Sequence, residues 1–112
     1  MINYNDRIFR SISNTENGEV SEETIFNYQQ NSFLVSATYT GGGILFGHLI
    51  GLVNTVGEME ICYHHVNDAG ELRTGICNST PEILPNGKIR LHEKWKWTNG
   101  DESEGESIVE EI

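Results

Sequence analysis

The chain has 112 residues, of which 37% are hydrophobic and 21% charged, with 12 glycines and two prolines. This length and composition predict one globular domain over residues 1–112 and exclude collagen-like and coiled-coil proteins. The longest apolar run, residues 42–53, contains His48 and is shorter than the roughly 18 residues of a spanning helix, so we expect no membrane partner. Seven basic against 17 acidic residues give a net charge of −10, which disfavours nucleic acid as a partner.

The first residues also bear on the compartment. Residues 1–6 have neither the basic region nor the apolar run of a secretion signal, so a cytoplasmic location is expected. Thiols stay reduced in that compartment, and Cys62 and Cys77 are therefore expected to be free.

Apolar and polar residues alternate with a period of two along most of the chain, which is typical of β-strands. The clearest run is 88–97, where the apolar positions are Ile89, Leu91, Trp95 and Trp97. The pattern predicts eight strands and little or no helix. Their expected ranges are 4–13, 23–29, 32–40, 44–53, 58–66, 71–80, 88–98 and 105–112.

Four of the predicted turns share one form, because residues 40–43, 54–57, 67–70 and 84–87 each end in glycine. This form is typical of a type I turn closed by a glycine bulge, in which the last residue has positive φ. The turn type fixes the register of each hairpin. The predicted pairs include Leu45 with Tyr39, Met59 with Val53, Tyr63 with Leu49, Arg73 with His65, Cys77 with Trp95, and Ser79 with Glu93.

Because paired residues share a face, all four registers place the odd-numbered residues from 33 to 97 on one side of the sheet. The large residues expected on this side are Phe33, Val35, Leu49, Ile61, Tyr63, Ile89, Leu91, Trp95 and Trp97. The opposite side is expected to hold Ile44, Phe46, Ile50, Leu52 and Ile76, although all five are apolar.

Successive hairpins form an up-and-down antiparallel meander, and eight such strands most naturally close into a barrel, which leaves no exposed edge. An open, strongly curved sheet that dimerises through its edges is the alternative. Residues 101–112 carry six acids and no base, whereas 88–96 carry four of the seven bases. This predicts charge pairing between the last two strands.

Glu93 breaks the alternation, because it falls on the apolar side between Leu91 and Trp95. A buried carboxylate needs a partner or becomes neutral. The partner is either a structural one, with Arg73, Arg10 and Ser79 as candidates, or a ligand inside the barrel. The residues expected to line such a ligand site are Tyr39, Tyr63, His65, Arg73, Ser79, Glu93, Trp95 and Trp97.

No catalytic motif, metal site or cofactor is predicted. Gly41 to Gly43 precede a strand and not a helix, so they indicate a turn and not a phosphate-binding loop. His64 and His65 point to opposite faces of a strand and cannot chelate one metal together.

Four segments carry a resemblance to a known family: RIFRS at 7–11, SNTENGEV at 13–20, STPEILP at 79–85 and RLHEKW at 90–95. Over nearly its whole length the chain resembles a family of small uncharacterised bacterial proteins often labelled "N-acetylglutamate synthase". That resemblance implies acetyl transfer from acetyl-CoA to glutamate. Acetyltransferases of the usual kind bind the cofactor pyrophosphate with a strand, a glycine-rich loop and a helix in succession. No such unit fits within the strand pattern of this sequence. In shape, the meander resembles calycin-like barrels of the lipocalin, fatty-acid-binding and streptavidin types.

Three functions follow as hypotheses. The first is a barrel that binds a small apolar or amphipathic molecule, without catalysis. The second is a structural or interaction domain whose interior is filled by side chains. The third is an enzyme, including the acetyltransferase. The protein is expected to be a monomer or a homodimer.

Overall fold

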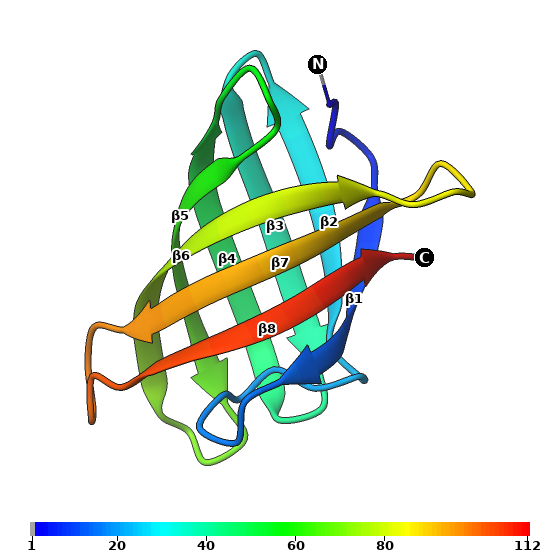
Figure 1. Cartoon of the computed structure of the whole chain (residues 1–112). Coiled ribbons are helices and arrows are strands. Elements are labelled where there is room, and N and C mark those ends of the chain that lie inside the picture. The colour runs from blue at the N-terminus through cyan, green and yellow to red at the C-terminus, as the bar shows by residue number, and fades with distance from the viewer. Residues whose placement is uncertain (1) are drawn as a thin grey trace.

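The computed structural model describes residues 2–112, which form eight antiparallel strands closed into a barrel (Figure 1). The strands are β1 (Ile8–Asn14), β2 (Ile25–Asn31), β3 (Leu34–Gly41), β4 (Ile44–Val53), β5 (Met59–Asn67), β6 (Leu72–Ile83), β7 (Ile89–Trp97) and β8 (Glu104–Glu111). Each strand pairs with its neighbours in sequence, and β8 pairs with β1. The predicted all-β meander and its closure are confirmed, and the open sheet is not observed. Met1, which the expected domain includes, lies outside the described residues.

Throughout residues 2–112 no helix has the length and apolar character needed to cross a membrane.

Three of the four predicted hairpin registers are confirmed. The turns before β5, β6 and β7 end in Gly57, Gly70 and Gly87, whose φ values are 87°, 77° and 84°. These positive φ values are the ones that a glycine bulge requires. Ser79 therefore pairs with Glu93, as predicted. The pairs in β4–β5 and β5–β6 also agree with the prediction.

The β3–β4 turn differs from the prediction. Positive φ occurs at Gly41 and Gly42, at 117° and 61°; β3 continues to Gly41, so the chain reverses over Gly42 and Gly43 alone and Gly41 pairs with Ile44. A ladder irregularity follows, and Tyr39 pairs with Gly47 instead of Leu45. As a result Ile44 is buried and Leu45 is 59% exposed, the reverse of the predicted faces. Adjacent glycines permit several turn geometries, which is why the sequence pattern misplaced this one.

Phe33 is the second error in the predicted inner face, because its side chain is 64% exposed. It follows Ser32, a turn residue with a φ of 58°, and therefore belongs to the β2–β3 turn rather than to a strand. The other large residues expected inside lie within the barrel. Of the five expected outside, Phe46, Ile50, Leu52 and Ile76 are exposed.

One end of the barrel is closed by the segment before β1. The prediction of a strand from residue 4 is wrong, because residues 2–7 lie across the barrel end. Tyr4 is fully buried there, packs against Phe9 and Tyr28, and donates a hydrogen bond to the carbonyl of Gly57. The opposite end is covered by the connection between β1 and β2, residues 15–24.

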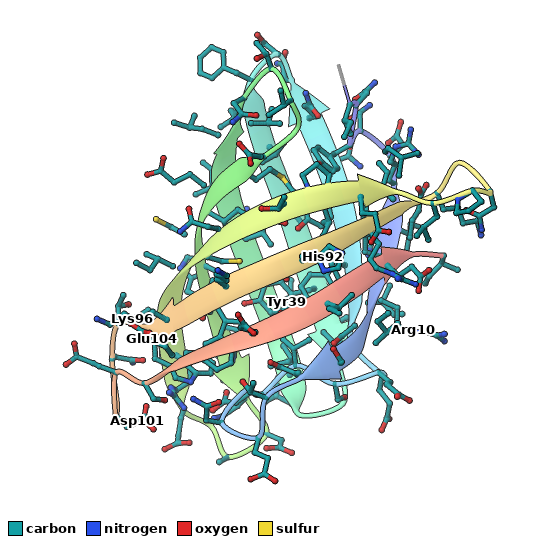
Figure 2. The ribbon with its side chains drawn as sticks, viewed as in Figure 1. Arg10, Tyr39, His92, Lys96, Asp101 and Glu104 are labelled. Atoms are coloured by element: carbon teal, nitrogen blue, oxygen red, sulfur yellow. The ribbon has the colours of Figure 1, made fainter. Side chains whose placement is uncertain are left out.

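The predicted charge pairing between the last strands is confirmed. Arg90 Nη2 lies 3.3 Å from Glu110 Oε1. Lys96 stands opposite Glu104 in the ladder, and Figure 2 shows both side chains at the same end of β7 and β8. The predicted thiol placement is also confirmed, because both cysteines are free, with Cys62 exposed and Cys77 buried.

Gly47→Ala should destabilise the protein by about 1–3 kcal/mol, because the new Cβ would overlap the Tyr39 ring. That ring cannot easily move, since it stacks on Phe26 and its hydroxyl is bonded to His65. Gly43→Ala is the control, because its Cβ would meet no atom closer than 3.7 Å. Urea unfolding measures both variants, and equal stability of the two would contradict this packing.

Candidate functional site: the barrel interior

A cavity of about 60 Å³ lies inside the barrel, beneath the 15–24 connection. Its wall is mostly apolar, and 15 residues contribute to it: Asn14, Gly18, Glu19, Val20, Phe26, Tyr39, Leu49, Ile61, Tyr63, His65, Cys77, Glu93, Trp95, Trp97 and Ser107. A single water molecule needs roughly 10–15 Å³ of cavity volume, so this cavity has room for a small ligand.

Aromatic rings stand on two sides of the cavity. On one side Phe26 and Tyr39 stack with ring centroids 4.9 Å apart. On the other, Trp97 packs against Trp95 and Tyr63 at centroid distances of 5.3 and 5.8 Å. Their positions follow from the strand alternation, which turns these side chains inward from four different strands.

The two indoles are tied to the last residue of β1 and to the connection that follows it. Trp95 Nε1 donates to Asn14 Oδ1, and Trp97 Nε1 donates to the carbonyl of Asn17, each at 3.1 Å. The Trp97 indole N–H therefore reports on whether the 15–24 connection is in place, and the Trp95 indole N–H reports on the end of β1.

Glu93 is the acidic group deepest in the cavity. Part of the residue remains accessible, but its carboxyl group is surrounded by barrel atoms. Ser107 Oγ donates to Glu93 Oε1 at 3.3 Å. Ser79 stands opposite Glu93 in the ladder, yet its buried hydroxyl completes no hydrogen bond of good geometry.

Burial raises the pKa of Glu93 to about 7, because the charged form loses its hydration. Ser79, Ser107 and Cys77 act in the opposite direction, since their polar hydrogens favour the carboxylate. No cationic side chain contributes. The structural ion pair considered for Glu93 is absent among residues 2–112, because Arg73 pairs with Glu19 and Arg10 is exposed.

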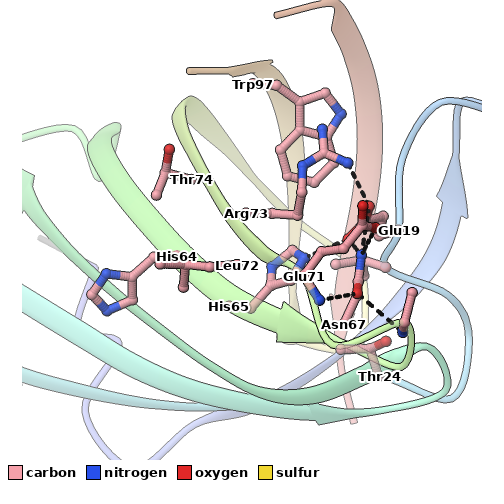
Figure 3. Close-up of polar contacts among 12 residues, drawn as sticks. Glu19, Thr24, His64, His65, Asn67, Glu71, Leu72, Arg73, Thr74 and Trp97 are labelled. Atoms are coloured by element: carbon pink, nitrogen blue, oxygen red, sulfur yellow. Dashed lines mark hydrogen bonds and ion pairs between the residues drawn. The ribbon is translucent and has the colours of Figure 1, made fainter. Parts of the chain in front are cut away.

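Glu19 joins the 15–24 connection to the barrel (Figure 3). Its Oε2 lies 2.6 Å from Arg73 Nη1, and its Oε1 lies 2.8 Å from His65 Nε2. The Arg73 guanidinium in turn lies over the Trp97 ring, 3.9 Å from the centroid. These contacts hold the connection over the cavity, and we call them the Glu19 latch.

His65 lies between the Glu19 carboxylate and the Tyr39 hydroxyl. Its Nε2 lies 2.8 Å from Glu19 Oε1, and its Nδ1 lies 2.9 Å from the Tyr39 hydroxyl, which also donates to the carbonyl of His64. Burial lowers the pKa of His65, and the bond to Glu19 opposes that effect only in part. An unfolded histidine takes up a proton below pH ~6.5 and the native one only at a lower pH, so this site loses stability on acidification.

The predicted ligand-site residues divide into two groups. Six line the cavity: Tyr39, Tyr63, His65, Glu93, Trp95 and Trp97. The other two lie next to the cavity, with Arg73 at its rim in the Glu19 latch and Ser79 beside Glu93. The predicted site omitted the other nine wall residues, among them Glu19, Val20 and Asn14. The one available signal was an apolar valine next to a glutamate in an otherwise polar loop.

Among the described residues, no group of three or more His, Cys, Asp or Glu side chains is arranged to hold a metal ion. Residues 2–112 also form no helix, so they contain no unit of strand, glycine-rich loop and helix that could bind a pyrophosphate.

The closed eight-strand meander with its interior cavity is a calycin-like barrel of the streptavidin type. The family model for avidin-like proteins matches residues 2–112, and the chain belongs to that family. The acetyl-transfer activity that the first resemblance implied gains no support from this match. Comparison with curated proteins and with solved structures gives no match.

Glu93→Gln should stabilise the protein at pH 8 by up to about 3 kcal/mol and leave it nearly unchanged at pH 5. The native carboxyl binds a proton with a pKa near 7 and the unfolded one near 4.5, so wild-type stability falls as the pH rises between these values. The amide removes this penalty. Chemical denaturation at both pH values measures it, with the exposed Glu60→Gln as control. A difference that does not depend on pH would refute the burial of this charge.

Glu19→Ala should release the 15–24 connection and expose the two tryptophans. We expect acrylamide quenching of Trp fluorescence to rise about twofold, because local opening needs only the latch to break. Glu16→Ala removes an exposed acid from the same connection and should leave quenching unchanged. Equal quenching in both variants would show that Glu19 does not hold this end closed.

Proposed function

We propose that this protein binds a small molecule inside the barrel, in the cavity beneath the 15–24 connection. One observation carries the proposal: the interior is not completely filled, and its remaining space combines apolar walls with a carboxyl group that has no cationic partner. Ligand sites in proteins typically have this composition, with mainly apolar walls and a few placed polar groups. Membership of the avidin-like family supports the same function.

The covered end is the route of entry. At the other end Tyr4 is fully buried and packed between Phe9 and Tyr28. At the cavity end, Glu19 and Arg73 keep 21% and 16% of their side chains exposed, so water reaches the Glu19 latch. Opening the latch gives access to the cavity without breaking a strand ladder.

Native mass spectrometry of protein purified from cells is the first experiment, because it detects a bound compound whatever its identity. Family membership makes biotin the first defined compound to add. The alternative, an interaction domain with a filled interior, predicts that neither experiment shows a bound molecule.

Cys77→Met should abolish ligand retention or weaken it by about tenfold, because the longer side chain occupies the cavity. Ile76→Met is the matched control, since it places the same side chain on the outer face of the same strand. Retention is measured by mass spectrometry, and folding is checked by thermal melting. Equal ligand retention by both variants would place the ligand outside the barrel.

A further inference from the structure

The cavity contains a carboxyl group with no opposite charge. The structure pairs Arg7 with Glu111, Arg73 with Glu19, and Arg90 with Glu110. No ion pair in residues 2–112 includes Glu93, and its polar neighbours are uncharged: Ser107 donates a hydrogen bond to it, and the Ser79 hydroxyl and Cys77 thiol lie beside it. A buried carboxylate without a cation is costly to hold, so a cation that enters the cavity gains strongly from its charge.

The walls of the cavity also favour a cation. Five aromatic side chains line it: Phe26, Tyr39, Tyr63, Trp95 and Trp97. Aromatic faces attract ammonium and guanidinium groups, and the attraction grows when water is excluded. Trp97 already takes part in such a contact at the rim, where Arg73 lies 3.9 Å from the ring centroid.

The charge of the protein and the size of the cavity restrict which ligands could bind. The net charge of −10 raises the local concentration of cations and repels anions. The cavity of about 60 Å³ limits the part of a ligand held within the closed barrel to a few heavy atoms.

We propose that the cavity takes a small organic ammonium ion, whose positive charge pairs with the Glu93 carboxylate among the aromatic rings. This inference rests on the proposed function, because it names the ligand class of the same cavity. No covalent step is involved.

Three compounds of nearly equal shape test whether the cavity selects its ligand by positive charge. Isopropylammonium is the cation, isopropanol the neutral molecule and isobutyrate the anion. The two indole N–H signals of the ¹⁵N-labelled protein are followed by NMR, since both groups lie beside the cavity. At pH 8 we expect the ammonium ion to bind at least about tenfold more tightly than isopropanol, and isobutyrate not to bind.

Glu93→Gln should weaken ammonium binding about tenfold or more and leave the affinity for isopropanol unchanged. Glu60→Gln, on the outer face, should bind all three compounds as the wild type does. The comparison of the three compounds on the wild type needs no variant, so a folding defect in Glu93→Gln would not remove the test.

Lowering the pH from 8 to 6 should weaken ammonium binding to the wild type about tenfold, because the Glu93 carboxyl, with a pKa near 7, becomes protonated. The titratable groups around it are Cys77 on β6, Tyr63 on β5, Tyr39 on β3, Tyr28 on β2, and Tyr4. Burial raises the pKa of each above this range. His65 lies at the rim, and burial lowers its pKa below the usual value of 6.5. Glu93 is therefore the group expected to change its charge between pH 8 and pH 6.

The outcomes separate this inference from the proposed function. If isopropanol or a neutral copurified compound binds in the cavity and the ammonium ion binds no better, the inference is wrong and the proposed function stands. The inference is also wrong if Glu93→Gln weakens ammonium and isopropanol equally. If neither a probe nor a cell-derived compound occupies the cavity, both proposals fall.

Discussion

The narrow interior of an eight-stranded barrel is the constraint on which the other features depend. Such a barrel holds little more than the side chains that point into it. Large rings therefore need glycines beside them: Gly47 stands opposite Tyr39 in the ladder, and Gly75 lies against Tyr63. Tyr4 fills one end, so the remaining space lies at the other end, around Glu93. The cavity is therefore small because the barrel is narrow. Its walls are aromatic because aromatic rings occupy most of the barrel interior.

Much of the fold could be predicted because side chains alternate strictly between the two faces of a β-strand. The turns then fix the register of each hairpin. Three turns ending in a single glycine gave registers that the structure confirms, and these place Glu93 opposite Ser79. The errors arose where backbone freedom is greatest. Gly41 to Gly43 allowed a tighter reversal, over Gly42 and Gly43 alone, that exchanged the faces of Ile44 and Leu45. Phe33 was assigned to a strand by alternation, although the turn at Ser32 directs it to solvent.

The candidate site could be predicted where strands supply it and not where a connection does. Tyr63, Trp95 and Glu93 follow from alternation, which also marks Glu93 as the polar exception. Glu19 does not, because residues 15–24 have no periodic pattern, and its contact with Arg73 spans 54 positions of sequence. Sequence spacing says nothing about such a contact. For the same reason Arg73 was expected as a ligand residue or as the partner of Glu93, whereas the structure pairs it with Glu19.

Closure of the barrel also determines when the cavity can exist during folding. The hairpins from β2 to β8 join neighbours in sequence, whereas the β1–β8 ladder joins the two ends of the chain. Bringing distant segments together carries the largest entropic cost, so this ladder is expected to form late. The cavity wall takes Asn14 from β1 and Ser107 from β8, and it is therefore incomplete until that step. A molecule held between these strands would consequently slow unfolding while leaving the rate of folding nearly unchanged.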